Sequence, residues 1–232
     1  EVKTINKTKT DASKREFLSV LMMSSLLMPK ALAARFRQQI GSLRPLKRTV
    51  PMMPPGAGDR ARFNSLCTSC HLCVSKCPGD VLQPSLLEYG VEGIMQPQML
   101  FDKGFCNYDC TLCTEVCPSG ALKTLTKEEK HRTQMGRVVF VIENCIVYRN
   151  ETHCGACSEH CPTQALRMVP YKGHLTIPEP HPDICIGCGG CEFICPVRPY
   201  KAVFVEGHEI QQVAKAFEDE EKQDIVLDDF GF

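Results

Sequence analysis

Sixteen cysteines are the residues of this chain best suited to chemistry, and they fall into four groups of four. Every group ends in a Cys-Pro pair, and no cysteine is left over. The groups are Cys67, Cys70, Cys73 and Cys77; Cys106, Cys110, Cys113 and Cys117; Cys145, Cys154, Cys157 and Cys161; and Cys185, Cys188, Cys191 and Cys195. Since the first cysteines of successive groups are 39 or 40 residues apart, one structural unit is reused along the chain.

The first and fourth groups have the spacing C-x2-C-x2-C-x3-C-P, which is the bacterial ferredoxin run for a [4Fe–4S] cluster. Three cysteines at every third residue wrap one loop around a cubane, and soft thiolate suits iron–sulfur chemistry. The fourth cysteine lies roughly one helical turn, or about 6 Å, further on and is aimed at a neighbouring cluster. The sequence therefore predicts that all sixteen cysteines bind four [4Fe–4S] clusters, grouped in pairs that exchange ligands.

Three other interpretations of the cysteines are weaker. Disulfides would not require four quartets that each end in Cys-Pro. Zinc sites use two CxxC pairs and rarely a third cysteine at the same spacing. Cys106, Cys110 and Cys113 have the CxxxCxxC spacing of radical S-adenosylmethionine enzymes, but Cys117-Pro118 follows them and the chain has no room for the expected barrel.

Histidines and small residues accompany the cysteine groups. His71, His153 and His160 lie inside groups, and His181 lies just before one. Because each group already has four thiolates, we interpret these histidines as exposed loop residues and not as ligands or proton-coupled redox tuners. Glycines beside the ligands let backbone N–H groups approach the sulfurs, and such hydrogen bonds help set the reduction potential.

Charge is distributed unevenly along a chain whose formal net charge is zero. Residues 1–66 carry 13 Lys and Arg against 4 Asp and Glu, whereas residues 206–232 carry 2 against 9. A basic head and an acidic tail suggest two docking surfaces, although both could be solvated extensions. The head lacks the interleaved aromatic residues of a nucleic-acid patch. We therefore expect no nucleic-acid partner, and peripheral contact of the head with anionic lipid or an acidic membrane subunit.

The elements that must position the cysteines are short. Strands are predicted at 138–142, 165–169 and 202–205, and a helix at 127–134 with capping-box spacing between Thr126 and Glu129. Residues 44–58 contain four prolines and predict an ordered or semi-rigid linker, and residues 209–222 predict an amphipathic helix. These features predict an α+β polyferredoxin of two bacterial dicluster ferredoxin-like modules. Its expected domains are a basic N-terminal extension (1–60), a four-cluster domain (61–205) and an acidic C-terminal helix and tail (206–232).

The N-terminal extension contains a segment that resembles an export signal. Ser13-Lys14-Arg15-Glu16-Phe17-Leu18 is similar to a twin-arginine signal with Lys in the first position, and an apolar run follows to Met28. Ala31-Leu32-Ala33 resembles a small-residue cleavage site, and the apolar run is too short to span a bilayer. An amphipathic helix packed on the cluster domain or on a membrane is the alternative. Since residue 1 is Glu, the chain could also be a fragment of a longer membrane protein.

Four further stretches carry a family resemblance over about residues 50–205. They are Pro54-Pro55-Gly56-Ala57; Cys117-Pro118-Ser119-Gly120-Ala121-Leu122; Met135-Gly136 with Glu143-Asn144-Cys145 and the eight-residue gap to Cys154; and His181-Pro182-Asp183-Ile184-Cys185-Ile186-Gly187-Cys188-Gly189. In these stretches the chain resembles the ferredoxin-type subunit of periplasmic nitrate-reductase quinol dehydrogenases and the related methylamine-utilisation ferredoxin. The second group departs from the family pattern, because its cysteines are spaced x3 then x2.

The resemblance implies that the first group pairs with the fourth and the second with the third. One cluster would then be held by Cys67, Cys70, Cys73 and Cys195, and its neighbour by Cys185, Cys188, Cys191 and Cys77. The other pair would be held by Cys106, Cys110, Cys113 and Cys161, and by Cys145, Cys154, Cys157 and Cys117. Gap lengths alone are equally compatible with pairing of consecutive groups.

The function that these features favour is electron transfer without catalysis. The resemblance implies a relay from a membrane quinol-dehydrogenase-type subunit to a soluble redox protein or oxidoreductase. The twin-arginine-like segment predicts a location at the membrane, on its periplasmic side, with the cytoplasm as the alternative. A second interpretation is an iron–sulfur subunit stably bound to a molybdopterin oxidoreductase. A third is a redox enzyme with one catalytic cluster, which would need an open iron that sixteen thiolates do not leave.

Overall fold

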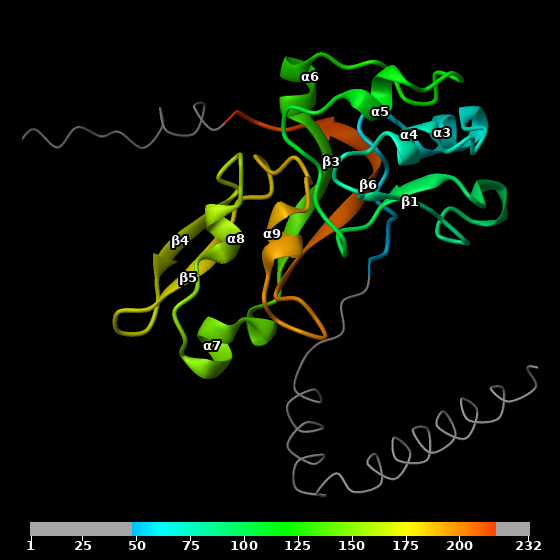
Figure 1. Cartoon of the computed structure of the whole chain (residues 1–232). Helices are drawn as coiled ribbons and strands as arrows, with labels where there is room; N and C mark the ends of the chain where they lie inside the picture. Colours follow the sequence, from blue (N-terminus) through cyan, green and yellow to red (C-terminus); the bar gives the residue numbers. More distant parts are fainter. Residues whose placement is uncertain (1–47, 217–232) are drawn as a thin grey trace, which may run out of the picture. The chain divides into compact units, whose positions relative to one another are not determined.

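A computed structural model describes residues 48–216, in which short helices and hairpins surround the cysteines (Figure 1). Their order along the chain is α3 (Arg60–Leu66), α4 (Leu72–Ser75), β1 (Leu82–Pro84), η1 (Val91–Gly93), β2 (Pro97–Met99), α5 (Leu112–Glu115), α6 (Lys127–Arg132), β3 (Thr133–Phe140), η2 (Ile142–Asn144), α7 (Ile146–Asn150), α8 (Ala156–Glu159), β4 (Leu166–Pro170), β5 (Thr176–Pro180), α9 (Gly190–Ile194) and β6 (Val203–Val213). The mixture of helix and strand agrees with the predicted α+β class.

Two modules of the same plan follow one another along the chain. In the first module, residues 60–122, the hairpin β1–β2 separates the short helices α4 and α5. In the second module, residues 142–198, the hairpin β4–β5 separates α8 and α9. A hairpin reverses the chain direction, so in both modules it returns the second helix to the side of the first.

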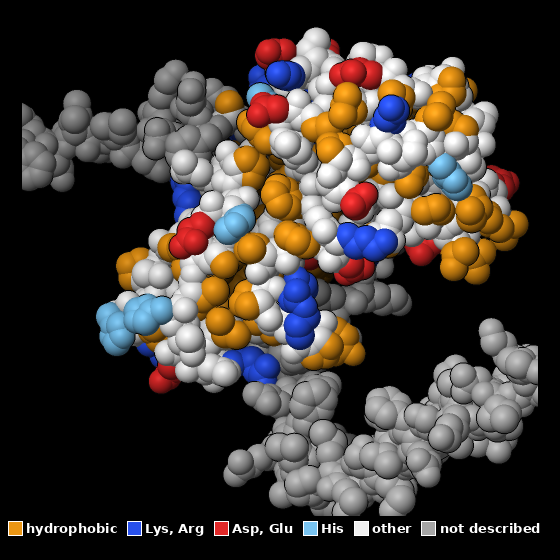
Figure 2. All heavy atoms as spheres, viewed as in Figure 1, with side chains coloured by type: hydrophobic (Ala, Val, Ile, Leu, Met, Phe, Trp, Pro, Cys, Tyr) orange, Lys and Arg blue, Asp and Glu red, His pale blue; other side chains and the backbone are white. Residues whose placement is uncertain are grey.

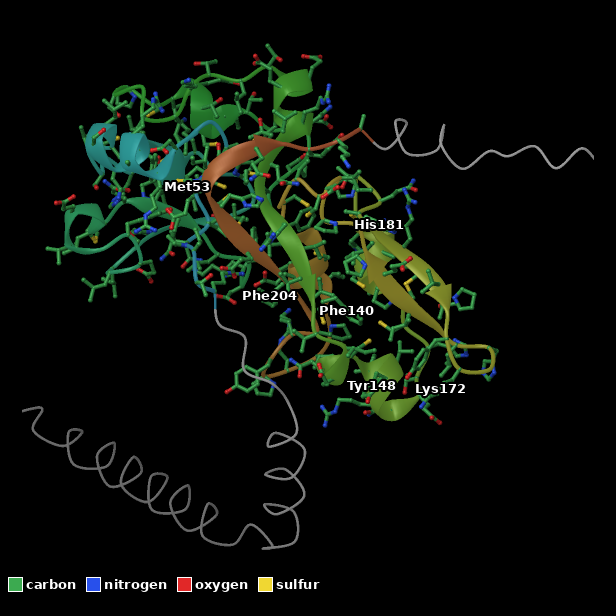
Figure 3. The ribbon with its side chains drawn as sticks, turned by 180° about the vertical axis from the view of Figure 1, so that it is seen from behind. Met53, Phe140, Tyr148, Lys172, His181 and Phe204 are labelled. Atoms are coloured by element: carbon green, nitrogen blue, oxygen red, sulfur yellow. The ribbon has the colours of Figure 1, made fainter. Side chains whose placement is uncertain are left out.

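A long antiparallel ribbon of β3 and β6 joins the two modules. Its register pairs Val138 with Val205 and Phe140 with Val203, and a bulge interrupts it between Gln134 and Gly136. Strand β3 leaves the first module and β6 returns to it from the second, so both connections run through this one ribbon (Figure 1). Viewed from behind, Phe140 and Phe204 lie toward the end of the ribbon next to α7, and Met53 lies toward the other end (Figure 3).

The segment predicted as a linker is part of the core. Met52, Met53 and Ala57 are at most 1% exposed and pack with the buried residues of the first module. Gly207 of β6 allows close approach here, because a Cβ at this position would lie 2.6 Å from the Pro51 carbonyl oxygen. Apolar side chains of this proline-containing segment are thus packed into the core, and the domain boundary at residue 61 stays a prediction.

Other predicted elements are confirmed or corrected by the same residues. Helix α6 is confirmed, with reciprocal capping hydrogen bonds between Thr126 and Glu129. The strands predicted at 138–142, 165–169 and 202–205 correspond to β3, β4 and β6, but β3 begins earlier and β6 continues to Val213. The helix predicted at 209–222 is wrong up to residue 213, because pairing with β3 keeps this part of the chain extended. The predicted export-signal segment and the acidic tail beyond residue 216 lie outside the described residues.

None of the helices formed by residues 48–216 combines the length and the apolar character that crossing a bilayer requires.

The buried position of Met53 predicts a measurable loss of stability on truncation. Met53→Ala should lower the free energy of unfolding by about 2–5 kcal/mol, because it removes apolar contacts and leaves a cavity in a packed core. Leu87→Ala is the matched control: Leu87 is 67% exposed, so its truncation should change the free energy by at most about 0.5 kcal/mol. Anaerobic denaturant titration of the metal-loaded protein measures both. If both variants lowered the free energy of unfolding by the same amount, residues 50–58 would act as a linker and not as part of the core.

Candidate iron–sulfur sites

The first module gathers its eight cysteines into two sets of four. One pocket is lined by Cys67, Cys70 and Cys73 together with Cys117, and we name this set site 1. A second pocket is lined by Cys106, Cys110 and Cys113 together with Cys77, which form site 2. In each set three ligands come from one cysteine group, and the fourth is the Cys-Pro cysteine of the other group.

The second module repeats this exchange of ligands. Site 3 comprises Cys145, Cys154, Cys157 and Cys195, and site 4 comprises Cys185, Cys188, Cys191 and Cys161. Burial raises the pKa of Cys157 to about 12, and the neighbouring thiols of Cys195, Cys154 and Cys145 raise it as well. Burial also raises the pKa of Cys185 to about 12, and the nearby Cys161 contributes in the same direction.

The pairing that the family resemblance implied is wrong. Cys195 does not complete the set of Cys67, Cys70 and Cys73, and Cys77 does not complete the set of Cys185, Cys188 and Cys191. Likewise Cys161 does not join Cys106, Cys110 and Cys113, and Cys117 does not join Cys145, Cys154 and Cys157. Instead, the first group exchanges ligands with the second, and the third with the fourth. The lengths of the gaps between groups were compatible with this pairing.

Topology explains the pairing of consecutive groups. Hairpins β1–β2 and β4–β5 connect the groups within each module and bring the next group back beside the first. Between the second and third groups the chain instead runs through β3, whose eight extended residues carry it roughly 25 Å along the ribbon. The third group is thereby delivered to a new module.

The donor sets fit iron–sulfur clusters. All sixteen cysteines are unbridged, and each site presents four sulfur donors. Among residues 48–216, no group of three or more His, Cys, Asp or Glu side chains is arranged to hold a single metal ion. Cys67, Cys70, Cys73 and Cys117 would hold one cubane, and the other three sites one each.

Burial controls the protonation of most of these thiols. It raises the pKa of Cys73 and of Cys188 to about 11, and the pKa of Cys191 rises well above its ordinary value for the same reason. Cys117 behaves differently: burial would raise its pKa, but hydrogen bonds from the Leu122 N–H and the Ser119 hydroxyl outweigh burial and lower it. Thiolates buried in this way need a cation to compensate them, which iron supplies.

Two of the Cys-Pro cysteines, which complete the set of the other group in their module, accept hydrogen bonds on their sulfur atoms. The backbone N–H groups of Leu122 and Ala165 donate to Cys117 Sγ and Cys161 Sγ at 3.4 Å and 3.1 Å. The hydroxyls of Ser119 and Thr163 lie 3.6 Å and 3.7 Å from the same two sulfurs. Such contacts disperse negative charge on sulfur and raise the reduction potential of a bound cluster.

Cations also lie beside site 3. The Cys195 carbonyl oxygen accepts hydrogen bonds from Arg198 Nη1 at 2.6 Å and from Lys201 Nζ at 3.0 Å. Burial lowers the pKa of Lys201, and the neighbouring Arg198 lowers it further. A third cation, Arg48, pairs with the buried carboxylate of Glu192 in α9, next to Cys191 of site 4. Positive charge is thus placed close to ligands whose bound form is anionic.

The histidines make contacts outside the donor sets. His71 Nε2 lies 2.7 Å from the Met95 carbonyl oxygen, and His160 Nδ1 lies 3.0 Å from the Ala156 carbonyl oxygen. The rings of His153 and His174 pack against each other with centroids 4.8 Å apart, and His181 Nε2 lies 3.8 Å from the Glu179 carboxylate. His153 and His160 are exposed, as predicted, whereas His71 and His181 are half-buried, so the prediction of exposed loop residues is wrong for these two.

Several residues around the sites were not singled out from the sequence. Ser119 and Thr163 occupy the same place, two residues after a Cys-Pro cysteine, and this repeat is a signal that the sequence contained. Arg198 and Lys201 follow the fourth group but show no periodicity. Lys130 lies on α6, distant in sequence from any ligand, and only the fold reveals that it is buried among cysteines.

Comparison with known proteins agrees with this geometry. Two models of a 4Fe-4S dicluster domain match the chain, one over residues 66–122 and one over residues 152–198. The chain is 32% identical over 179 residues to the methylamine utilization ferredoxin-type protein MauM of Methylophilus methylotrophus, which covers 69% of this chain and 73% of that protein. The chain belongs to the ferredoxin-type 4Fe-4S dicluster proteins.

Two further relatives come from Escherichia coli strain K12. The ferredoxin-type protein NapG is 32% identical over 155 residues, covering 63% of this chain and 66% of NapG. The ferredoxin-type protein NapF is 26% identical over 156 residues, covering 67% of this chain and 86% of NapF. The resemblance inferred from the motifs is thereby confirmed. Each dicluster match contains cysteines of two consecutive groups. As a member of this family, the chain is a ferredoxin-type protein that transfers electrons through [4Fe–4S] clusters.

Paired substitutions distinguish the two ligand assignments. Cys67→Ala combined with Cys117→Ala should perturb one cluster signal in low-temperature electron paramagnetic resonance of the reduced protein, because both thiols serve site 1. Cys67→Ala combined with Cys195→Ala should perturb two signals, because these thiols serve sites 1 and 3. The assignment of the first group to the fourth predicts the opposite result for the two pairs, so either outcome decides between them.

Proposed function

We propose that this protein carries four [4Fe–4S] clusters and relays single electrons from a membrane quinol-dehydrogenase-type subunit to a soluble redox partner. The observation that carries the proposal is the presence of four complete sets of four thiols. A full set leaves no ligand position for a substrate, which favours electron transfer over catalysis. Each bound cluster would supply a centre that accepts and releases one electron.

Contacts between thiols of different sites support a single line of sites. Within the first module Cys73 lies close enough to Cys113 for its charge to act on that thiol, which joins site 1 to site 2. Within the second module Cys157 acts in the same way on Cys191, which joins site 3 to site 4. Between the modules the Cys106 N–H donates to the Cys188 carbonyl oxygen at 2.9 Å, which joins site 2 to site 4. The order along the line is therefore site 1, site 2, site 4, site 3.

An apolar face beside site 1 is the proposed docking surface for one partner protein. We define this face as Leu72, Leu86, Leu87, Val91, Ile94 and Met95, whose exposure ranges from 41% to 78%. It is held against the site 1 loop by the His71 contact with Met95 and by the Ser69 hydroxyl, which donates to the Ile94 carbonyl oxygen at 3.4 Å. Cys70, an exposed ligand of site 1, lies in the same loop. Figure 2 shows apolar side chains gathered over the β1–β2 hairpin.

The membrane side of the relay is proposed from charge and from the relatives. The basic residues 1–66 suit an acidic membrane subunit or anionic lipid, and the relatives named above are ferredoxin-type proteins. We place the protein at the membrane, on its periplasmic side. Protease accessibility of the chain in intact spheroplasts tests this placement.

Iron and sulfide quantification tests the number of clusters. After anaerobic reconstitution we expect about 16 irons and about as many sulfides per chain, because each of four sites holds a cubane. About eight irons, or bound zinc, would defeat the four-cluster assignment.

Substitutions on the apolar face should slow exchange with a partner without altering the clusters. Leu86→Ser combined with Val91→Ser removes two of the most exposed apolar side chains, so the rate of electron transfer to the partner should fall by about tenfold or more, which corresponds to about 1.4 kcal/mol of docking free energy. Iron content and reduction potentials should not change. Val213→Ser is the control, because Val213 is 73% exposed at the end of β6 and outside this face. Unchanged exchange rates in the double variant would exclude this face as the docking surface.

A further inference from the structure

Lys130 is fully buried, which is unusual for a lysine. Apart from the Cys106 thiol, which interacts with it, its ammonium group has no hydrogen-bond partner among residues 48–216. An uncompensated ammonium in a protein interior costs several kcal/mol, so a buried lysine is normally paired with a negative charge. The groups around Lys130 should therefore supply that charge in the functional protein.

The groups that Lys130 faces are cluster ligands from both modules. Its charge acts on the thiol of Cys106 and, more weakly, on the thiols of Cys113 and Cys188, in each case favouring the thiolate against the larger effect of burial. Cys106 and Cys113 belong to site 2, whereas Cys188 belongs to site 4. Lys130 thus lies at the junction where the Cys106 N–H donates to the Cys188 carbonyl oxygen.

Helix α6 fixes this position. Its first turn is closed by the Thr126–Glu129 capping box, and the Lys130 N–H donates to the Thr126 carbonyl oxygen at 2.9 Å. The next residue, His131, stacks on the Tyr108 ring with a centroid distance of 3.9 Å and contacts the Asp109 carboxylate at 2.8 Å. Because the residues before and after Lys130 are fixed by these contacts, its side chain cannot extend the ammonium group to solvent as an exposed lysine does.

We propose that Lys130 is a positioning residue that raises the reduction potentials of the two inner sites, 2 and 4, and so favours passage of the electron between modules. This inference rests on the proposed four-cluster relay. Four thiolates outweigh the charge of an iron–sulfur core, so each occupied site is anionic and becomes more anionic on reduction. A fixed ammonium in a low-dielectric surrounding stabilises the reduced form more than the oxidised form.

The electron transfer at this junction is balanced without any proton. With both sites occupied, one electron would be given up at site 2, an oxidation, and taken up at site 4, a reduction, or the reverse. Lys130 acts only through its charge. Because it faces ligands of both sites, it stabilises an added electron at site 2 and at site 4. The potentials of sites 1 and 3, at the two ends of the line, are not affected.

The test is a redox titration of the reconstituted protein followed by electron paramagnetic resonance. Lys130→Met removes the charge and keeps a side chain of similar length. Two of the four cluster transitions should move to lower potential by at least about 59 mV, which is a tenfold change in a one-electron equilibrium. The other two should stay within error of the wild type. Lys130→Arg, which restores a cation, should return the two potentials toward the wild-type values.

Lys127→Met is the matched control, because Lys127 is an exposed lysine on the same helix and should leave all four potentials unchanged. Should Lys130→Met lose iron, Lys130→Gln is titrated in its place, since Gln keeps a polar head without charge. Unchanged potentials, or an equal shift of all four, would overturn the role of Lys130. Wild-type protein with about eight irons would instead defeat the four-cluster proposal itself, so the two failures are distinguishable.

Discussion

Compensation of buried thiolate charge is the constraint on which this structure depends. Burial raises the pKa of Cys73 and Cys188 to about 11 and that of Cys157 and Cys185 to about 12, so the protein alone favours neutral thiols in its core. Binding iron requires those protons to leave and returns the free energy as metal–sulfur bonds, which makes cluster insertion part of folding. The same anionic centres supply the counter-charge that the fully buried Lys130 otherwise lacks.

Hairpins and one ribbon turn a repeated motif into two modules. Each hairpin, β1–β2 or β4–β5, returns a second cysteine group beside the first so that the two exchange their Cys-Pro ligands. The β3–β6 ribbon separates the modules in sequence and holds them together in space, and residues 50–57 complete its cover. In the proposed relay, ligand exchange within each module and the contact of Cys106 with Cys188 between modules arrange the sites in a line.

Polar groups near the sulfurs make the four sites unequal although their ligands are identical. Sites 1 and 4 have hydroxyls close to Cys117 and Cys161, site 3 has two cations on the Cys195 carbonyl, and the junction of sites 2 and 4 has a buried ammonium. Each of these groups stabilises negative charge and shifts a potential upward. Differences in potential along a relay therefore arise from the second layer of residues, which the cysteine spacing does not reveal.

The sequence by itself determined the chemistry of this protein. Sixteen thiols in four groups that each end in Cys-Pro predict [4Fe–4S] ligands and the two-module α+β class, and the spacing of Thr126 and Glu129 predicts the capped helix α6. Both are available from the sequence because ligand spacing and helix capping are local properties. The sequence could not determine which groups share ligands, because gap lengths permit several pairings and the hairpins that choose among them are tertiary. The extended course of residues 209–213 was hidden for the same reason, since a partner strand overrides helical periodicity. Only the fold placed Lys130 between Cys106 and Cys188, because burial is a property of everything that packs around a residue.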